Sequence, residues 1–335
     1  MVRLIIDVGS WTTKIYMLGC GVVLSEATCV AVQDAEGGKV SIKSFGDDAR
    51  ALSGRAAYNT RIINPVCEGE IVQPKLLSAL LSHFLEKVEV TRRKARNCEI
   101  MFIVPCSATD KLLNCYRSIA EELNVGRLYF TRTPYAALLG QGVNLSPSHP
   151  VFCVDVGYGK TEIAVFSLDG MISGFSINLG GGNIDVHIMD LLYEDFSVKI
   201  GALTAEKLKN VVGSLLKDDN KMTVVDGRDA VSGAPSSVAI NSSHLEEVIK
   251  LYVDKIIEYT RSVLSELPAE VSSAVVHGGI YLTGGLTRLD GFAEYFAEHL
   301  GVSVNQSDEP IFAPVLGGCT ILSSPQLCSA LATLG

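Results

Sequence analysis

The stretch RLIIDVGSWTTKIYML at residues 3–18 is written a second time as VFCVDVGYGKTEIAVF at residues 151–166. Each copy has an apolar run, the triplet Asp-Val-Gly, a short turn and an alternating segment. This pattern is typical of a β-hairpin, because period-two alternation flanks a turn rich in residues that accept unusual backbone angles. Equal spacing pairs Asp7 with Asp155, Gly9 with Gly157 and Thr13 with Thr161. One such turn in each half predicts two related domains that clamp a polyphosphate, since the N–H groups of such turns bind phosphate.

Length and composition agree with two globular domains. The 335 residues are 47% hydrophobic, which is enough for two buried cores. The net charge of −9 argues against a dedicated nucleic-acid binder. The nine cysteines contain no C-x-x-C pair, which favours free thiols in a reducing compartment. We therefore expect a cytoplasmic protein that binds no nucleic acid.

Alternation of strand-like and helix-like segments predicts an α/β fold. Pro74 is expected to begin a helix with an apolar stripe, and S-x-x-D at Ser107 and S-x-x-E at Ser243 predict two further helix starts. The polar segment NLSPSHP is the expected domain boundary. The expected parts are domain I at 1–146 with a small subdomain at about 21–73, domain II at 147–314 with a small subdomain at about 186–245, and a C-terminal segment at 315–335 that returns to domain I.

Asp7 and Asp155 each end an apolar strand, where α/β sheets place groups that bind ligands. Either aspartate alone would be explained by hydrogen bonds to turn amides. The matched pair favours a hydrated Mg²⁺ held through water, because Mg²⁺ keeps several waters when it binds beside phosphates.

The turn residues themselves are candidates for phosphate binding. The first turn is formed by Ser10, Trp11, Thr12 and Thr13. Lys14 follows it and can reach a β or γ phosphate as a point charge, although a lone hairpin would simply leave it in solvent.

In the second turn Gly157 and Gly159 flank Tyr158, and Lys160 follows. The glycines permit close approach of the backbone to a ligand. Gly181 lies in a run of three glycines that is expected beside the same site, although such runs are also common as hinges.

A third glycine turn contains Gly284, Gly285 and Leu286. It ends a buried strand and leads toward a helix, an arrangement that suits a nucleoside or an α-phosphate.

Eight segments together resemble one known family: DVGSWTTK, FIVPCSAT, TPYAALLGQG, VDVGYGKTEIAVF, INLGGGNID, IGALTAEKLKN, VDGRDAVSGAPSSVAI and YLTGGLTRLDGF. In this order and spacing, the chain looks like a member of the MreB family of bacterial actin homologues over nearly its whole length. The resemblance implies the actin/heat-shock chaperone ATPase (ribonuclease H-like) fold, with ATP and Mg²⁺ in the interdomain cleft. It also implies filaments that organise cell shape and work with cell-wall synthesis proteins.

The resemblance also assigns residues. Ser10 to Thr12 match the family's first phosphate turn and Gly157 to Lys160 its second. Glu206 and Lys209 match the pair that contacts the nucleoside, and Gly284 to Thr287 match the adenosine turn. Without the resemblance, Glu206 and Lys209 would be an ordinary exposed helix pair.

Two departures from the family concern hydrolysis. The acidic residue that precedes Pro134 in the family is Thr133 here, and the catalytic threonine of the second turn is Lys160. Neither residue orients water as a carboxylate does. The sequence therefore predicts nucleotide binding with slow or absent hydrolysis, at most a weak ATPase, and leaves the catalytic residues unassigned.

The loop that carries exposed apolar residues in the family reads EVTRRKARNCE here. Its basic residues are Arg92, Arg93, Lys94 and Arg96. They would attract an anionic lipid surface at ~1 kcal/mol per charge, or they form a solvated loop; both readings stay open. A phosphotransferase of the same fold, such as a sugar or acetate kinase, is the alternative function. It requires a substrate base, typically Asp or His near the γ-phosphate, and the sequence offers no convincing one.

Overall fold

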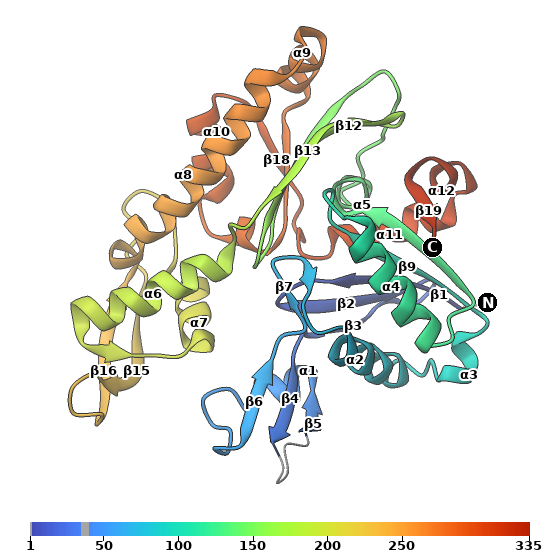
Figure 1. Cartoon of the computed structure of the whole chain (residues 1–335). Helices are drawn as coiled ribbons and strands as arrows, with labels where there is room; N and C mark the ends of the chain where they lie inside the picture. The colour runs from blue at the N-terminus through green and yellow to red at the C-terminus, as the bar shows by residue number, and fades with distance from the viewer. Residues whose placement is uncertain (1, 35–39) are drawn as a thin grey trace. The chain divides into compact units, whose positions relative to one another are not determined.

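The computed structural model describes residues 2–34 and 40–335 (Figure 1). The chain forms two compact units. Unit 1 consists of Met1–His149, Ala164–Ser176 and Ile311–Gly335, and unit 2 of Pro150–Ile163 and Ile177–Pro310. The division passes through strands β12 (Thr161–Ser167) and β13 (Gly170–Ile177).

Unit 1 is built on a six-stranded sheet in the order β19-β10-β9-β1-β2-β3. Strand β1 pairs antiparallel with β2, with Val8 opposite Thr13, which confirms the first predicted hairpin. It runs parallel to β9, and β9 parallel to β10. The strands span Val2–Val8 (β1), Thr12–Met17 (β2), Gly21–Ala27 (β3), Cys98–Val104 (β9), Arg127–Arg132 (β10) and Ala332–Leu334 (β19).

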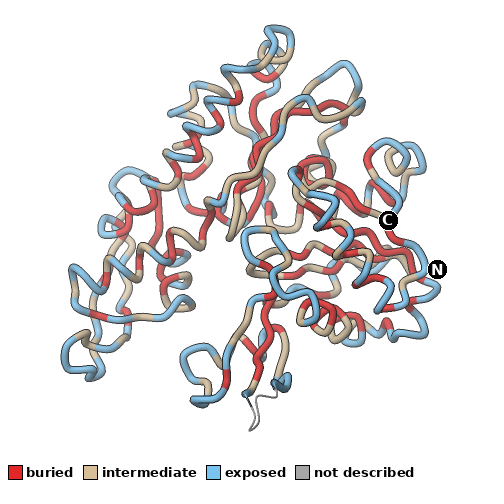
Figure 2. The backbone as a smooth tube through the Cα atoms, in the orientation of Figure 1, coloured by how far each residue is buried: buried red, intermediate tan, exposed pale blue. Residues whose placement is uncertain are grey.

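Both faces of this sheet are covered. All seven residues of β9 are buried, as expected for a central strand in an α/β sheet (Figure 2). Leu4 and Phe102 pack in one core with helices α2 (Pro74–Lys87) and α4 (Asp110–Glu122). Ile5 faces the other way and lies against α11 (Ala313–Ser323).

Helix α2 begins at Pro74, as predicted, and buries Leu77, Leu80, Leu81 and Phe84. The predicted cap of α4 is wrong by two residues. Thr109, not Ser107, is the N-cap, and its side chain accepts a hydrogen bond from the Leu112 N–H. Both hydroxyls suit a cap chemically, so only the backbone path selects between them.

Helices α5 (Thr133–Gly140) and α11 pack unusually closely. A Cβ atom at Gly140 would lie 1.9 Å from the Ala313 carbonyl oxygen, and one at Gly317 would lie 1.7 Å from the Ala136 carbonyl oxygen. Glycine is required at both positions because any side chain would collide with backbone.

The rest of unit 1 consists of small elements. A three-stranded sheet has the order β5-β4-β6 and a hairpin pairs β7 with β8. The bounds are Val30–Asp34 (β4), Val40–Phe45 (β5), Gly46–Arg50 (α1), Thr60–Ile63 (β6), Val66–Cys67 (β7), Glu70–Ile71 (β8), Arg92–Ala95 (α3) and Pro325–Leu331 (α12).

Unit 2 contains most of a five-stranded sheet in the order β13-β12-β11-β17-β18 and a three-stranded sheet in the order β14-β15-β16. The strands are Val151–Val156 (β11), Val198–Lys199 (β14), Met222–Asp229 (β15), Pro235–Asn241 (β16), Ile280–Thr283 (β17) and Val304–Gln306 (β18). The helices are Gly181–Phe196 (α6), Ala202–Val212 (α7), Ser242–Glu266 (α8), Ala269–Gly278 (α9), Phe292–Leu300 (α10) and a 3-10 helix η1 at Gly285–Arg288. Helix α8 is capped by Asn241 rather than Ser243, a second correction to a predicted helix start.

Among the residues that the structure describes, no helix is both long enough and apolar enough to span a membrane.

Candidate nucleotide-binding site

The two copies of the repeated turn share one internal hydrogen bond. The Gly9 N–H donates to the Thr12 carbonyl at 3.2 Å, and the Gly157 N–H donates to the Lys160 carbonyl at 2.9 Å. A Cβ atom at Gly9 would lie 2.9 Å from that carbonyl oxygen, and one at Gly157 would lie 3.1 Å from it. The sequence repeat is therefore also a repeat of backbone geometry, and glycine at its first position permits the tight turn.

The paired threonines support these turns from inside. Thr13 and Thr161 are both fully buried. The Thr13 hydroxyl shares a 2.8 Å hydrogen bond with the Thr28 hydroxyl, and the Thr161 hydroxyl donates to the Leu179 carbonyl at 2.8 Å. In this structure Thr13 thus lies beneath the first turn, whereas Ser10, Trp11 and Thr12 are partly exposed.

A hairpin of the small subdomain covers the first turn. The Gly69 N–H, in the turn between β7 and β8, donates to Ser10 Oγ at 3.3 Å. Glu68 and Gly69 both have positive φ, at 50° and 77°, which is typical of a two-residue hairpin turn. Among the described residues Ser10 Oγ serves as an acceptor, and a serine hydroxyl can also donate its proton to a further acceptor.

Asp7 and Lys14 lie opposite each other on β1 and β2 and form an ion pair. The distance from Lys14 Nζ to Asp7 Oδ2 is 2.8 Å, and the side chains are 12% and 17% exposed. Lys14, which was predicted to reach phosphate, is therefore held beside Asp7, which was predicted to hold hydrated Mg²⁺. The ammonium retains donors beyond this one bond, and the carboxylate has a second oxygen.

Asp155, the second predicted magnesium carboxylate, is half-buried in β11. Its register partner in the parallel strand β17 is Thr283, the residue before the third glycine turn. The end of β11 and this turn are consequently neighbours in unit 2.

The second turn is joined to the start of α6 by backbone hydrogen bonds. The Gly181 N–H donates to the Gly157 carbonyl at 3.0 Å and the Gly182 N–H to the Tyr158 carbonyl at 2.8 Å. The first amides of α6, which have no partner within the helix, are therefore satisfied by carbonyls of the turn. Gly159 and Lys160 remain partly exposed at the same turn.

Lys209 is buried rather than exposed, and it links three parts of unit 2. Its ammonium lies 2.6 Å from Asp185 Oδ1 of α6 and donates to the Gly181 carbonyl at 2.9 Å. It also lies 5.7 Å from the centre of the Tyr158 ring, within the range of a cation–π contact. The helix-pair reading of this lysine is excluded, since its side chain is only 5% exposed.

Asp185 is a residue that the sequence reasoning missed. Burial raises its pKa, and Lys209 opposes the rise by charge and hydrogen bonding, so that the pKa is about 6. Glu206 raises the pKa further and a hydrogen bond with Tyr158 lowers it. The only signal was an aspartate four residues after Gly181 in the quoted INLGGGNID segment. Glu206, on the same helix as Lys209, is half-buried.

The third turn is held by close contacts that require glycine. Gly284 has a φ of +92°, and a Cβ atom there would lie 2.4 Å from the Val156 carbonyl oxygen. The Thr287 hydroxyl donates to the Gly284 carbonyl at 2.8 Å. A Cβ atom at Gly181 would lie 3.7 Å from Leu286 Cδ1. The second and third turns and the start of α6 therefore form one cluster in unit 2.

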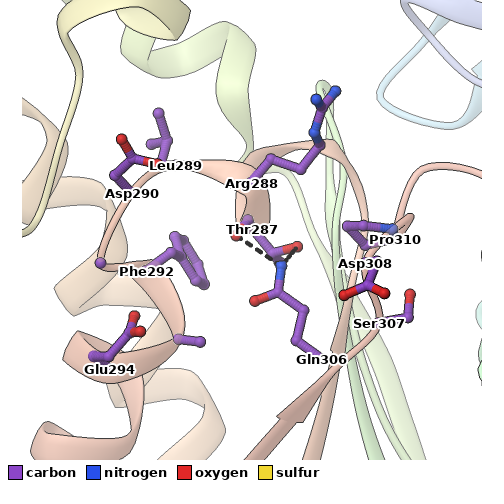
Figure 3. A pocket seen from close by; sticks show the side chains of 12 residues that line it. Thr287, Arg288, Leu289, Asp290, Phe292, Glu294, Gln306, Ser307, Asp308 and Pro310 are labelled. Carbon is purple, nitrogen blue, oxygen red and sulfur yellow. Dashed lines mark hydrogen bonds between the residues drawn. The ribbon is translucent and has the colours of Figure 1, made fainter.

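A polar pocket of about 380 Å³ lies beside the third turn (Figure 3). Thr287 is the one predicted site residue that lines it. Gln306 Nε2 donates to both the carbonyl and the hydroxyl of Thr287, at 2.9 and 3.0 Å, and fixes η1 from the pocket side. Gly285, the first residue of η1, is exposed.

Neither Thr133 nor Lys160, the two positions at which a departure from the family was expected, carries a carboxylate. The Thr133 hydroxyl donates to the Val104 carbonyl at 3.1 Å, within unit 1. Arg132 donates to the carbonyls of Pro105 and Ala108 at 2.9 and 3.1 Å. Thr133 and Arg132 therefore hold the end of β9 and the loop that follows it, and neither offers a carboxylate to a water.

The basic residues Arg92, Arg93, Lys94 and Arg96 are all exposed in and after the short helix α3. Within the described residues, no three His, Cys, Asp or Glu side chains gather as ligands for a metal ion.

Comparison with known proteins decides the family. A family model described as MreB/Mbl protein matches residues 1–329. The chain belongs to the MreB/Mbl family. The cell shape-determining protein MreB of Escherichia coli (strain K12) is 30% identical over 315 residues, which cover 93% of this chain and 91% of the relative.

Solved structures show that this MreB/Mbl chain has the actin-like fold. The crystal structure of MreB 5 of Spiroplasma citri bound to AMPPNP has a TM-score of 0.90 at 23% identity and covers 96% of both chains. The MamK double helical filament has a TM-score of 0.76 at 18% identity and covers 96% of this chain and 99% of the other. The fold predicted from the resemblance is confirmed.

Proposed function

We propose that this MreB/Mbl protein is a nucleotide-dependent filament protein that organises cell shape. The single observation that carries the proposal is the repeated turn, with the same Gly-to-carbonyl hydrogen bond at 3.2 Å in one copy and 2.9 Å in the other. The family supports the cellular role, since its curated relatives are named cell shape-determining proteins. The names AMPPNP-bound MreB 5 and MamK double helical filament support nucleotide binding and self-assembly by analogy.

In unit 1, the first turn would contact phosphate through its backbone N–H groups and the hydroxyl of Ser10. Trp11 and Thr12 complete the turn, and Thr13 supports it from the core. Lys14 would add a positive charge to the terminal phosphates while it keeps its bond to Asp7.

In unit 2, Gly157 to Lys160 would contact phosphate in the same way, through the backbone of the second turn. The nucleoside would be bound by Glu206 together with the third turn, Gly284 to Thr287. Lys209 and Gly181 would shape this region, because Lys209 is already committed to Asp185 and the Gly181 carbonyl.

Asp7 and Asp155 would hold Mg²⁺ through water. Hard carboxylate oxygens suit this ion, which prefers to keep several waters and phosphate oxygens as ligands. The charge of the ion would neutralise phosphate oxygens, and these two residues would orient its water shell.

Hydrolysis is expected to be slow or absent. Thr133 donates its hydroxyl proton to the Val104 carbonyl, and Lys160 is a cation rather than an acceptor for the proton of a water. The role is thus structural, with at most weak ATPase activity. Membership of the MreB/Mbl family favours this role over a sugar or acetate kinase.

A cytoplasmic filament of this kind would work beside the membrane and with cell-wall synthesis proteins. The exposed cluster Arg92, Arg93, Lys94 and Arg96 would contact anionic lipid. Such charges attract an anionic surface by about 1 kcal/mol each within a Debye length.

Calorimetry and electron microscopy test the proposal together. We expect the full chain to bind ADP and AMPPNP with Mg²⁺, and to form filaments with AMPPNP. The variant Glu206→Gln should bind more weakly, whereas Lys207→Met, an exposed neighbour on α7, should bind as the wild type does. A wild-type protein that takes up no adenine nucleotide would refute the proposal.

A further inference from the structure

Arg50, the last residue of α1, lies directly on the first phosphate turn. Its guanidinium carbon is 3.9 Å from the centre of the Trp11 ring. Its Nη2 also donates a hydrogen bond to the Trp11 carbonyl. The two residues are 39 positions apart, so only the fold brings them together.

The Trp11 carbonyl accepts a second hydrogen bond, from the Thr28 N–H at 3.0 Å. In a trans peptide the carbonyl and the following N–H point in opposite directions. Fixing the Trp11 carbonyl toward Thr28 and Arg50 therefore directs the Thr12 N–H to the other side, toward the turn that Gly9 opens. The orientation of a phosphate-binding amide depends on the groups that hold this carbonyl.

The Arg50 guanidinium forms no ion pair among the residues that the structure describes. Within residues 2–34 and 40–335, no carboxylate oxygen lies within 4.0 Å of its guanidinium nitrogens. Cys29 is a further neighbour: burial raises the pKa of its thiol, and Arg50 opposes that rise. Asp47 is close to the same thiol, but its Oδ1 accepts the Ala27 N–H at 2.9 Å. The guanidinium thus brings a positive charge to the turn, and none of the described carboxylates pairs with it.

We propose that Arg50 is a positioning residue of the first phosphate turn, which acts through Trp11 and links α1 and its three-stranded sheet to nucleotide occupancy. The inference rests on the proposed nucleotide binding. Arginine is suited to this task because its planar guanidinium can stack on an aromatic ring and at the same time donate hydrogen bonds in its own plane. Its charge also attracts phosphate to the turn through space.

Trp11 is the only tryptophan in the chain, so the tryptophan fluorescence of the protein comes from this residue alone. The experiment titrates the full-length wild type, Arg50→Gln and Arg50→Lys with ADP and AMPPNP in the presence of Mg²⁺. It measures affinity by calorimetry, and it measures Trp11 emission and acrylamide quenching in the same samples. Arg55→Gln, an exposed position five residues further along, is the matched control.

We expect nucleotide to shift Trp11 emission in the wild type and in R55Q. In R50Q we expect affinity to fall at least tenfold and the nucleotide-dependent shift to disappear. R50K should bind with intermediate affinity, since it keeps the charge but not the planar stack, and it serves as the informative variant if R50Q does not fold. Equal affinity and an equal Trp11 response in all variants would overturn the inference alone. A wild type that binds no nucleotide would overturn the proposed function and the inference with it.

Discussion

Replacing Lys209 by methionine should destabilise the protein by an amount that grows with pH. Lys209 and Asp185 form a buried ion pair at 2.6 Å, with side chains 5% and 1% exposed. Methionine has a similar length, so the substitution removes the ammonium with little change in packing. What remains is a buried carboxyl group without its cation.

The expected magnitude follows from this burial. Removing one partner of a buried ion pair typically costs about 3–5 kcal/mol, because the other charge is left uncompensated. The wild-type pKa of Asp185 is about 6 instead of 3.8. That difference corresponds to roughly 3 kcal/mol, so ionising Asp185 is already less favourable by this amount in the folded wild type than in the unfolded chain.

The sign of the pH dependence is set by the raised pKa. The folded state holds the Asp185 proton more tightly than the unfolded chain, so this group lowers stability as pH rises from 3.8 to about 6. In K209M the pKa should lie above the wild-type value, because Lys209 lowers it by charge and hydrogen bonding. The loss of stability caused by ionising Asp185 should then continue to higher pH in K209M, whereas in the wild type it is complete above the wild-type pKa.

Urea denaturation at pH 5 and pH 8 provides the assay. We expect K209M to lose about 3–5 kcal/mol at pH 8 and clearly less at pH 5, where the carboxyl group is protonated. The double variant D185N/K209M should regain most of the loss at pH 8, since no carboxylate remains to be buried. Lys207→Met, on an exposed position of the same helix, is the control and should change little. An equal loss at both pH values, or no recovery in the double variant, would refute this reasoning.

Three further predictions concern the other parts of the site. Gly284→Ala should destabilise by at least about 1–3 kcal/mol, since the residue has a φ of +92° and a Cβ atom would collide with Val156; Gly201→Ala, where a Cβ atom meets nothing within 4 Å, is the thermal-melting control. The double variant T133E/K160T should raise phosphate release from ATP at least tenfold, because it restores an acceptor for the water; a rate equal to that of the wild type would count against the assigned reason for slow hydrolysis. Neutralising Arg92, Arg93, Lys94 and Arg96 to glutamine should abolish sedimentation with anionic vesicles at low salt while neutral vesicles show no change, and undiminished sedimentation would exclude these residues as the contact.

The sequence predicted those helices and strands that depend on residues close together in the chain. The first hairpin and the helix at Pro74 follow from periodicity and turn residues that act over a few positions. The helix caps were less certain. Thr109 and Asn241 cap helices for which Ser107 and Ser243 were predicted, because several neighbouring side chains have the right chemistry.

The buried polar contacts could not be predicted. Lys209 reads as a solvent-exposed residue in the sequence, and its pairing with Asp185 depends on how α6 and α7 pack. Lys14 was predicted to reach phosphate or to lie in solvent, and its ion pair with Asp7 is a consequence of the register between β1 and β2. Such pairs are invisible to spacing rules because the partners are brought together by sheet register and helix packing.

The amino-acid sequence by itself determined the fold family and the shared geometry of the two repeated turns, because glycine at the first turn position permits the same tight backbone path in both copies. Tertiary structure alone decided which polar and aromatic side chains meet: Asp7 with Lys14, Asp185 with Lys209, and Arg50 with Trp11. The physical reason is the distance along the chain over which each kind of interaction acts. Backbone preferences act between neighbours in the chain, whereas an ion pair or a cation–π contact requires two side chains within a few ångströms in space, and only the packed sheet and helices bring them so close.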